Sequence, residues 1–178
     1  MTRCLETART IADLKELPIT ELPEVGEVRY GKWEGKKIKK LAKKREWYAV
    51  QHYPSRFTFP DGESFSEVKF RAVSAIESLV TRHEKEIVAV VSHADVIKLV
   101  LAHYLGVPLD LFQRTGLSPA SVSVLALSAN GTVRVLRIND DGPLKPPSEP
   151  KKKEGSGQDQ EESDAQNKPQ SSPAAHLV

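Results

Sequence analysis

The sequence has few of the features that would place a protein in a membrane or outside the cell. Its 178 residues include one cysteine, Cys4, which excludes an internal disulfide and a zinc site built from several cysteines. No apolar run approaches the roughly 20 residues that a membrane-spanning helix needs, and no signal peptide is recognisable. We therefore expect a cytoplasmic protein with no membrane partner.

Several sequence signatures of catalysis are also absent. The histidines show neither an i,i+4 pair nor any other spacing typical of metal ligands; they are His52, His83, His93, His103 and His176. The G-x-S-x-G motif of serine hydrolases does not occur, and neither does a G-x-G-x-x-G motif or a P-loop. The sequence therefore gives little support to a metal site, a serine nucleophile or a nucleotide-binding loop.

The composition favours one globular domain followed by a tail. Hydrophobic residues make up 39% of the chain and charged residues 28%, and the net charge of +2 implies no particular partner. From residue 141 onward the chain has no aromatic residue and holds half of its 12 prolines, so this part cannot bury enough surface to fold. We expect a folded domain over residues 1–140 and a disordered tail over residues 141–178.

Two segments have the periodicity of amphipathic helices. Residues 4–15 predict the first helix, followed by a short extended piece at residues 18–19. Residues 62–83 predict a long helix that opens with a capping box made by Ser64 and Glu67. The apolar face of the first helix is formed by Leu5, Ala8, Ile11 and Ala12, and that of the second by Phe65, Val68, Ala72, Ile76 and Leu79.

A histidine follows the most apolar run of the sequence. Residues 87–91 predict a strand buried on both faces, as in a parallel sheet. A helix is predicted next, and it ends at Gly106. His93 therefore lies where ligands bind in open α/β sheets and where the free N–H groups of a helix attract anions. The alternative is that Ser92 or His93 only caps the helix, or that His93 is a hydrogen-bonded core residue.

The end of the predicted domain has the pattern of a β-hairpin. Two apolar runs, residues 121–127 and 132–138, flank the dipeptide Asn130-Gly131, which is typical of a tight hairpin turn. With the predicted helices and the predicted strand, this hairpin favours an α/β fold.

Residues 36–45 contain seven lysines and arginines, with Ile38, Leu41 and Ala42 on another helical face. One interpretation is a helix that binds a polyanion. The other is a solvated helix face beside an electropositive site. We favour the second, because no aromatic residue interleaves the charges as in proteins that stack nucleobases.

Four short motifs occur in the order in which they occur in the histidine phosphatase superfamily, also called phosphoglycerate mutase-like. RCLETA (Arg3–Ala8) resembles its arginine followed by x-x-[EQ]-T-A, and EVRYGKWEG (Glu27–Gly35) resembles its E-x-x-x-G-x-W-E-G loop. Gly62-Glu63-Ser64 resembles the G-E-S that opens a helix, and VVSHADVI resembles V-S-H-G-x-x-[IV]-R. Each motif is weak alone, but four in order over residues 3–138 make a strong resemblance.

The resemblance implies a role for three residues. His93 would donate a hydrogen bond to the oxygens of a phosphoryl group, and Arg3 would bind the same oxygens through its planar guanidinium. Glu27 would protonate the leaving oxygen and then activate water. No metal or other cofactor is implied, because arginine and imidazole neutralise the phosphoryl charge. Ser64 is interpreted only as a helix cap.

The sequence departs from the family pattern at three points. Ala94 replaces the usual glycine, and Lys98 replaces the arginine that often follows. The family's L-x-R-H-G motif, whose histidine attacks phosphorus, is absent, and Arg82-His83 does not fit it because Glu84 follows. We expect the nucleophile to lie upstream, in a strand–helix–strand portion that a truncated sequence lacks; the alternative is a reduced relative without catalysis.

The resemblance implies a three-layer α/β/α fold with a mostly parallel sheet, a C-terminal hairpin and a missing N-terminal portion. The expected function is hydrolysis of a phosphomonoester through a phosphohistidine, with mutase activity as a less favoured variant. The alternative is a non-catalytic protein that binds phosphorylated ligands or polyanions. We expect a small phosphorylated metabolite as the partner and no nucleic acid, unless the basic residues 36–45 bind one.

Overall fold

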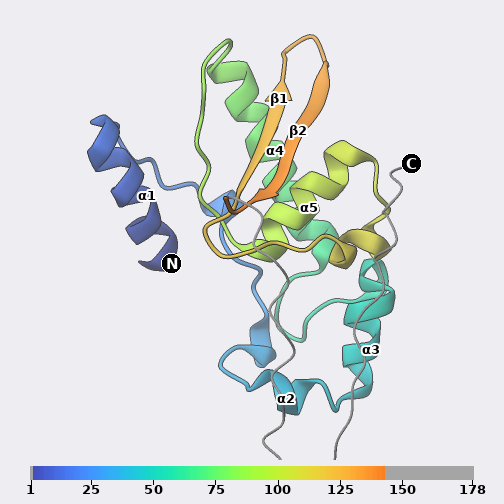
Figure 1. Cartoon of the computed structure of the whole chain (residues 1–178). Coiled ribbons are helices and arrows are strands. Elements are labelled where there is room, and N and C mark those ends of the chain that lie inside the picture. Colours follow the sequence, from blue (N-terminus) through green and yellow to red (C-terminus); the bar gives the residue numbers. More distant parts are fainter. Residues whose placement is uncertain (1, 143–178) are drawn as a thin grey trace, which may run out of the picture. The chain divides into compact units, whose positions relative to one another are not determined.

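The computed structural model describes residues 2–142, which lie within one compact unit. From residue 143 onward, the predicted tail lies outside the described residues. The elements, with η for a 3-10 helix, are α1 (Thr2–Lys15), η1 (Pro23–Val25), η2 (Gly31–Trp33), α2 (Ile38–Leu41), α3 (Arg45–His52), η3 (Pro54–Arg56), α4 (Phe65–Arg82), α5 (Ala94–Leu105), η4 (Leu109–Arg114), β1 (Val122–Leu127) and β2 (Val133–Asp140) (Figure 1).

Helices α4 and α5 form the centre of the described domain. Along α4, Phe65, Val68 and Ala72 are at most 1% exposed, as the periodicity predicted, while Ile76 and Leu79 are half-buried. The capping box is confirmed: the Glu67 carboxylate accepts from the Ser64 N–H at 2.7 Å, and the Ser64 hydroxyl accepts from the Glu67 N–H. The helix therefore begins where the sequence predicts.

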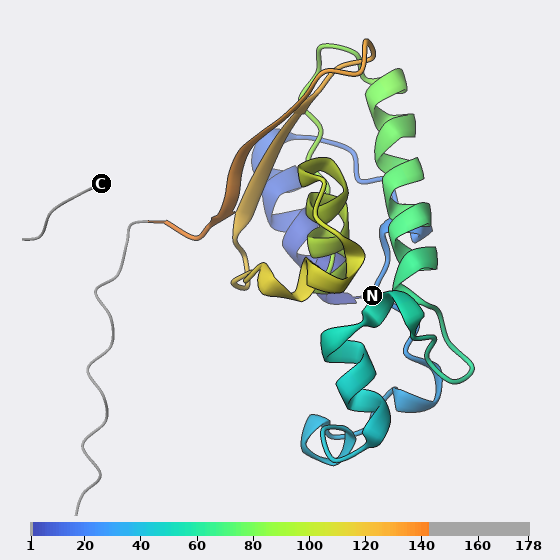
Figure 2. The same ribbon diagram turned by 90° about the vertical axis from the view of Figure 1, so that its right-hand side faces the viewer.

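The hairpin and the second central helix were also predicted correctly. Strands β1 and β2 pair antiparallel around Asn130 and Gly131, with Leu127 opposite Val133. Helix α5 ends at Gly106, whose φ of 68° is the left-handed conformation that glycine adopts without strain. Figure 2 shows α5 between the hairpin and α4, and α5 contacts both.

Helix α1 forms as predicted but buries little of its apolar face. Ala12 is its one buried residue, whereas Ile11 is 44% exposed. Its side-chain hydrogen bonds to the rest of the described residues come from Arg3 and Cys4, near its first turn. The apolar periodicity therefore predicted the helix correctly but not its degree of burial.

The predicted buried strand over residues 87–91 is wrong for the described structure. These residues form no strand, and Ile87 is fully exposed while Val88 and Val90 are 42% and 39% exposed. A strand needs a neighbour for its N–H and C=O groups, and within residues 2–142 the one sheet is the β1–β2 hairpin. The three-layer parallel arrangement is therefore not formed by the described residues, and the missing N-terminal portion stays a prediction.

The basic residues 36–45 form no continuous helix. Helix α2 is one turn long, and α3 begins only at Arg45. Leu41 is buried as expected, but Ile38 is 69% exposed. None of the described helices is both long enough and apolar enough to cross a bilayer.

Candidate active site

Three residues that are far apart in the sequence meet at one point. The Arg3 Nη2 atom lies 2.7 Å from the Glu27 Oε2 atom and 2.9 Å from the His93 Nδ1 atom. His93 Nδ1 also lies 3.2 Å from Glu27 Oε2. Helix α1, the loop before η2 and the start of α5 each supply one of these side chains.

His93 precedes α5 without capping it. It occupies the N-cap position, but its side chain makes no capping hydrogen bond. The Ser92 hydroxyl donates to the Val25 carbonyl at 2.6 Å rather than to the helix. The alternative that either side chain caps this helix is therefore wrong. The imidazole instead faces Arg3 and Glu27 while its side chain is only 4% exposed.

The surroundings keep the His93 imidazole neutral. Burial lowers its pKa, the Glu27 carboxylate opposes this, and the Arg3 guanidinium lowers the pKa further. Nδ1 can accept from the Arg3 guanidinium at 2.9 Å or donate to the Glu27 carboxylate at 3.2 Å, depending on the tautomer of the ring. The neutral ring carries one N–H donor, on whichever nitrogen the tautomer places it.

Arg3 keeps donors free for a ligand. Its side chain is 64% exposed, whereas that of Glu27 is 13% exposed. Within the described residues only its Nη2 atom makes hydrogen bonds. The Nε and Nη1 donors can therefore bind an anion through the planar fork of the guanidinium.

The backbone that carries Glu27 is held by a half-buried arginine. Arg71, on α4, donates to the carbonyls of Glu24, Gly26 and Glu27, the last two at 3.0 Å. The same guanidinium binds both carboxylate oxygens of Glu63, at 2.9 and 3.0 Å. Arg71 therefore connects α4 to the loop that positions Glu27.

Glu63 is the second half of this support. It is 5% exposed, and its carboxylate also accepts from the backbone N–H and the guanidinium of Arg29. Burial alone would raise its pKa, but the hydrogen bonds from Arg71 and Arg29 lower it to about 2. Glu63 is thus a buried anion at neutral pH.

Two glycines allow the Glu27 loop to approach the segment before α4. Gly31 has a φ of 52°, and a Cβ there would lie 2.2 Å from the Pro60 carbonyl oxygen. At Gly62 a Cβ would lie 2.3 Å from the Arg29 carbonyl oxygen. The glycines of E-x-x-x-G and G-E-S therefore both permit the close approach of these two backbone segments. The segments are also joined by the hydrogen bond from the Glu63 N–H to the Arg29 carbonyl.

The same loop is also tied to the first turn of α5. The Tyr30 hydroxyl donates to the Asp95 carboxylate at 3.1 Å. Burial and the Asp95 charge raise the pKa of Tyr30, so its proton stays on the hydroxyl. This bond links the element that carries Glu27 to the helix that follows His93.

Cys4 lies against the same histidine. Its Sγ atom is 3.4 Å from His93 Nε2 and 3.6 Å from the Ser92 carbonyl oxygen. The thiol is half-buried. The single cysteine of the chain therefore reports directly on the surroundings of His93.

The remaining candidate residues lie as follows. Ser64 is a helix cap, as interpreted. Ala94 is the exposed first residue of α5, and Lys98 lies 3.6 Å from Asp95. His83 pairs with Glu86 at the end of α4. Within residues 2–142 no three histidine, cysteine, aspartate or glutamate side chains are grouped to hold a metal ion.

Sequence reasoning missed Arg71, Tyr30 and Cys4. The i,i+4 spacing of Glu67 and Arg71 is typical of a surface ion pair, which would have assigned Arg71 to the wrong partner. Glu67 is occupied by its capping box, and Arg71 turns to Glu63 instead. No local pattern indicates that choice.

The family model of the histidine phosphatase superfamily (branch 1) matches residues 1–141, and the chain belongs to that family. It is 30% identical over 138 residues to phosphoserine phosphatase 1 of Hydrogenobacter thermophilus, covering 75% of this chain and 64% of that protein's length. The chain thus spans somewhat less than two thirds of this relative.

Two further proteins are similar to the chain. Adenosylcobalamin/alpha-ribazole phosphatase of Escherichia coli is 26% identical over 137 residues, which cover 75% of this chain and 68% of the relative. The solved structure of YhfR from Bacillus stearothermophilus superposes with a TM-score of 0.73 at 29% identity, covering 79% of this chain and 70% of that one. These two curated relatives are named as phosphatases, and the likeness to YhfR shows that the chain shares the fold of that structure.

Proposed function

We propose that the chain carries most of the active site of a phosphomonoesterase whose nucleophile is a histidine from outside the printed sequence. The observation that supports this most directly is the meeting of Arg3, Glu27 and His93 within 3.2 Å. These are a cationic fork, a carboxylate and an imidazole, the groups that phosphoryl transfer without a metal requires.

In the proposed reaction the outside histidine attacks phosphorus and the ester oxygen leaves. Free donors of Arg3 and an N–H of the His93 ring bind the phosphoryl oxygens, where negative charge develops in the transition state. Glu27 gives a proton to the leaving oxygen. It then takes a proton from the water that attacks the phosphohistidine, which releases inorganic phosphate.

The substrate is proposed to be a small phosphorylated metabolite. The relatives carry the names of phosphoserine and alpha-ribazole phosphatases, and hydrolysis is therefore favoured over mutase activity. No metal ion is proposed, because the guanidinium and the imidazole can stabilise the charge of the phosphoryl group in place of a metal.

The second candidate is a protein that binds phosphorylated ligands without turning them over. The observation that favours it is that no R-H-G occurs in the printed sequence. Both candidates require an anion to bind between Arg3 and His93. The two candidate functions differ only in whether a nucleophile is present beside Arg3 and His93. Binding and turnover must therefore be tested separately.

Cys4 provides the binding test. Since it is the single cysteine and its sulfur lies 3.4 Å from His93, its reaction with a fluorescent maleimide measures access to the site. Inorganic phosphate should slow labelling of the 178-residue chain in a saturable way. The effect should be lost in Arg3→Ala and retained in Arg9→Ala, an exposed position on the same helix.

Labelling that phosphate leaves unchanged, or that it slows equally in both variants, would remove the phosphate-binding assignment. The turnover test then separates the two candidates. The 178-residue chain should show no detectable hydrolysis of p-nitrophenyl phosphate, because no nucleophile is positioned in it. Robust hydrolysis that His93→Ala abolishes would show that the nucleophile is assigned wrongly.

A longer protein that contains this sequence and an upstream R-H-G should hydrolyse phosphomonoesters and resist chelators. Arg3→Ala or His93→Ala should lower its rate about 10²–10³-fold, the usual cost of one donor to a developing oxyanion. Glu27→Gln should lower the rate strongly for alkyl phosphates and less for p-nitrophenyl phosphate, whose phenolate leaves with less need of a proton. Equal losses for both esters would exclude Glu27 as the acid.

A further inference from the structure

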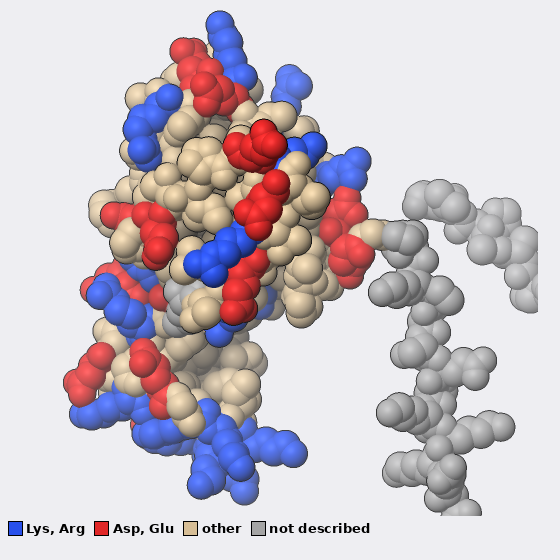
Figure 3. Space-filling view, turned by 90° about the vertical axis from the view of Figure 1, so that its left-hand side faces the viewer, with Lys and Arg blue, Asp and Glu red and all other residues tan. Residues whose placement is uncertain are grey.

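The strongest concentration of charge in the molecule lies in residues 36–45. This segment, called here the lysine-rich segment, contains no acidic residue. Every one of its basic side chains is exposed, and among the described residues none forms an ion pair. Figure 3 shows lysine and arginine side chains gathered at the end of the molecule where α2 lies. Its basic residues are Lys36, Lys37, Lys39, Lys40, Lys43, Lys44 and Arg45.

Stability does not account for this concentration. Like charges so close together repel each other and destabilise the compact state. The segment contributes to the core through Leu41, which is 6% exposed, and not through its lysines. An anionic partner would remove the repulsion, so the charge is suited to binding.

Helix α3 adds exposed aromatic rings next to this charge. Arg45, Tyr48 and His52 are spaced at i, i+3 and i+7 and therefore share one face of the helix. All three are exposed, and the rings of Tyr48 and His52 are 4.1 Å apart. Tyr48 is 57% exposed, and Tyr53, whose ring lies 5.7 Å from that of Tyr48, is 41% exposed.

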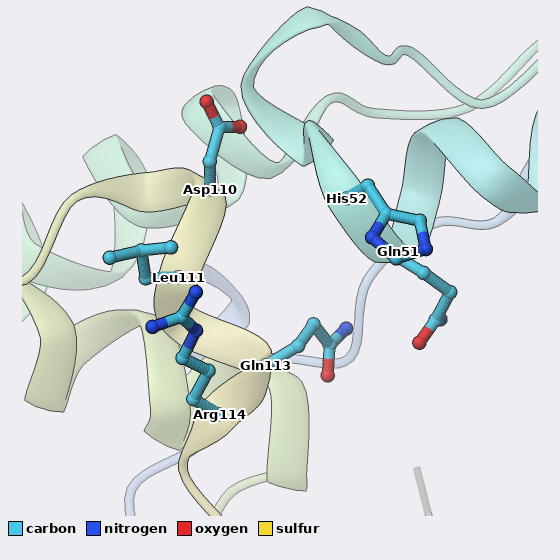
Figure 4. A pocket seen from close by; sticks show the side chains of 6 residues that line it. All are labelled: Gln51, His52, Asp110, Leu111, Gln113 and Arg114. Carbon is cyan, nitrogen blue, oxygen red and sulfur yellow. The ribbon is translucent and has the colours of Figure 1, made fainter.

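Of these rings, His52 lines a polar hollow of about 420 Å³ between α3 and η4. In Figure 4, Gln51 and His52 from α3 face Gln113 and Arg114 from η4 across it. Hollows of this size hold small ligands, and amide side chains can hydrogen-bond to the edge of a nucleobase. Asp110 and Arg114 also line the hollow and carry opposite charges, so the positive charge of this surface comes from the lysine-rich segment.

We propose that the lysine-rich segment and the exposed face of α3 bind a single-stranded nucleic acid, with phosphates on the lysines and a base on Tyr48. Proteins that bind single strands combine a basic track with stacking rings in this way. An anionic membrane is the less favoured partner, because α2 is one turn long and presents a single exposed aliphatic side chain, Ile38. This surface is independent of the proposed phosphatase site.

The test is fluorescence anisotropy of a labelled oligouridylate of about 12 nucleotides with the 178-residue chain. Single-strand binding weakens with salt by a slope of about −0.7 per neutralised phosphate in a plot of log K against log salt. About four contacts should therefore give a slope near −3. Changing Lys36, Lys37, Lys39 and Lys40 to Gln should weaken binding at least tenfold and make the slope shallower.

A matched variant controls for net charge. It changes four exposed basic residues elsewhere to Gln, namely Arg9, Lys15, Lys85 and Arg134, and should bind like the unchanged chain. Tyr48→Ala should weaken binding about tenfold through loss of stacking, whereas Tyr48→Phe should change it little. Circular dichroism melting checks that each variant is folded.

Three results would overturn the proposal. The first is no binding of the oligouridylate at low salt. The second is equal weakening by the two four-residue variants, since the lysine-rich segment would then act only through net charge. The third is binding to vesicles containing phosphatidylserine that depends on the same four lysines, with no binding of the oligouridylate, which would make the surface a membrane contact.

Discussion

The two sides of the candidate site are held in different ways. On one side, the loop that carries Glu27 is fixed through hydrogen bonds by Glu63, which is buried, and by Arg71, which is half-buried. On the other side, the residues before His93 run along the surface, and Ile87 is fully exposed. Backbone hydrogen bonds from residues 87–91 to other described segments are absent.

The comparison shows which part of the site the described residues can build alone. The Glu27 side draws its partners from two segments, residues 24–31 and 62–71, and both lie within the described residues. The His93 side contains apolar residues that would suit the interior of a sheet, but no neighbouring strand is present among residues 2–142. Its geometry rests on α5 and on the contacts with Arg3 and Cys4.

The largest loss of stability is expected when the contacts that hold the Glu27 loop are removed. Arg71→Leu removes the cation that Glu63 faces and leaves three carbonyls without their donor. Removing one partner of a buried ion pair typically costs about 3–5 kcal/mol, and Arg29 retains part of the interaction with Glu63. We expect a loss of about 3 kcal/mol in the free energy of unfolding, measured in urea.

Arg82→Leu is the matched control on the same helix. Arg82 is exposed and its side chain bonds only to its own helix, at the Ser78 carbonyl, so the change should cost less than about 0.5 kcal/mol. Arg71→Lys should lie between the two, because one ammonium cannot replace a fork that reaches both Glu63 and the loop. Equal stability of the two leucine variants would show that the loop is held by something else.

A smaller loss of stability is expected when Glu63, on the same side, is protonated. The pKa of Glu63 is lowered from 4.5 to about 2 in the folded chain. A carboxyl group with a lowered pKa stabilises the fold above its ordinary pKa, and this contribution is lost as pH falls from about 4.5 towards 2. Glu63→Gln should therefore be less stable than the unchanged chain at pH 7, and the difference should shrink over that acid range.

The measurement is urea unfolding of both proteins at several pH values between 7 and about 2.5. Glu67→Gln is the control variant. The Glu67 carboxylate caps α4 at the surface, so a pH dependence of stability in this variant would come from the helix cap and not from the contacts of Glu63 with Arg71 and Arg29. A stability difference between Glu63→Gln and the unchanged chain that stays constant down to the lowest pH would show that the Glu63 carboxylate is not held ionised by Arg71 and Arg29.

Sequence patterns predicted the elements whose stability is local. The capping box at Ser64, the hairpin at Asn130-Gly131 and the end of α5 at Gly106 each depend on interactions within a few residues. Such signals can be recognised from a few neighbouring residues of the sequence. They were therefore predicted with nearly correct bounds.

Features that depend on distant partners were harder to predict. The apolar run 87–91 was predicted as a buried strand, but burial requires neighbours that the described residues do not contain. Arg71 was missed because its partners lie 8 residues away at Glu63 and 44 to 47 residues away in the loop that carries Glu27. His93 was singled out by its position after an apolar run, whereas Arg3 and Glu27 were selected through the family resemblance, since no spacing in the sequence brings the three together.

The smallest change in stability is expected for a substitution in the exposed residues before His93. Ile87→Thr keeps a β-branched side chain and removes apolar surface that is fully exposed in the structure, so it should change the free energy of unfolding by less than about 0.5 kcal/mol. Leu99→Ala on α5 is the buried comparison; Leu99 is 0% exposed, and such a change typically costs about 2–5 kcal/mol. Both are measured in urea on the 178-residue chain. A loss above about 2 kcal/mol for Ile87→Thr, close to that of a core leucine, would mean that residues 87–91 are packed in solution. The contrast between the two sides of the site would then be removed, because His93 would be supported as firmly as Glu27.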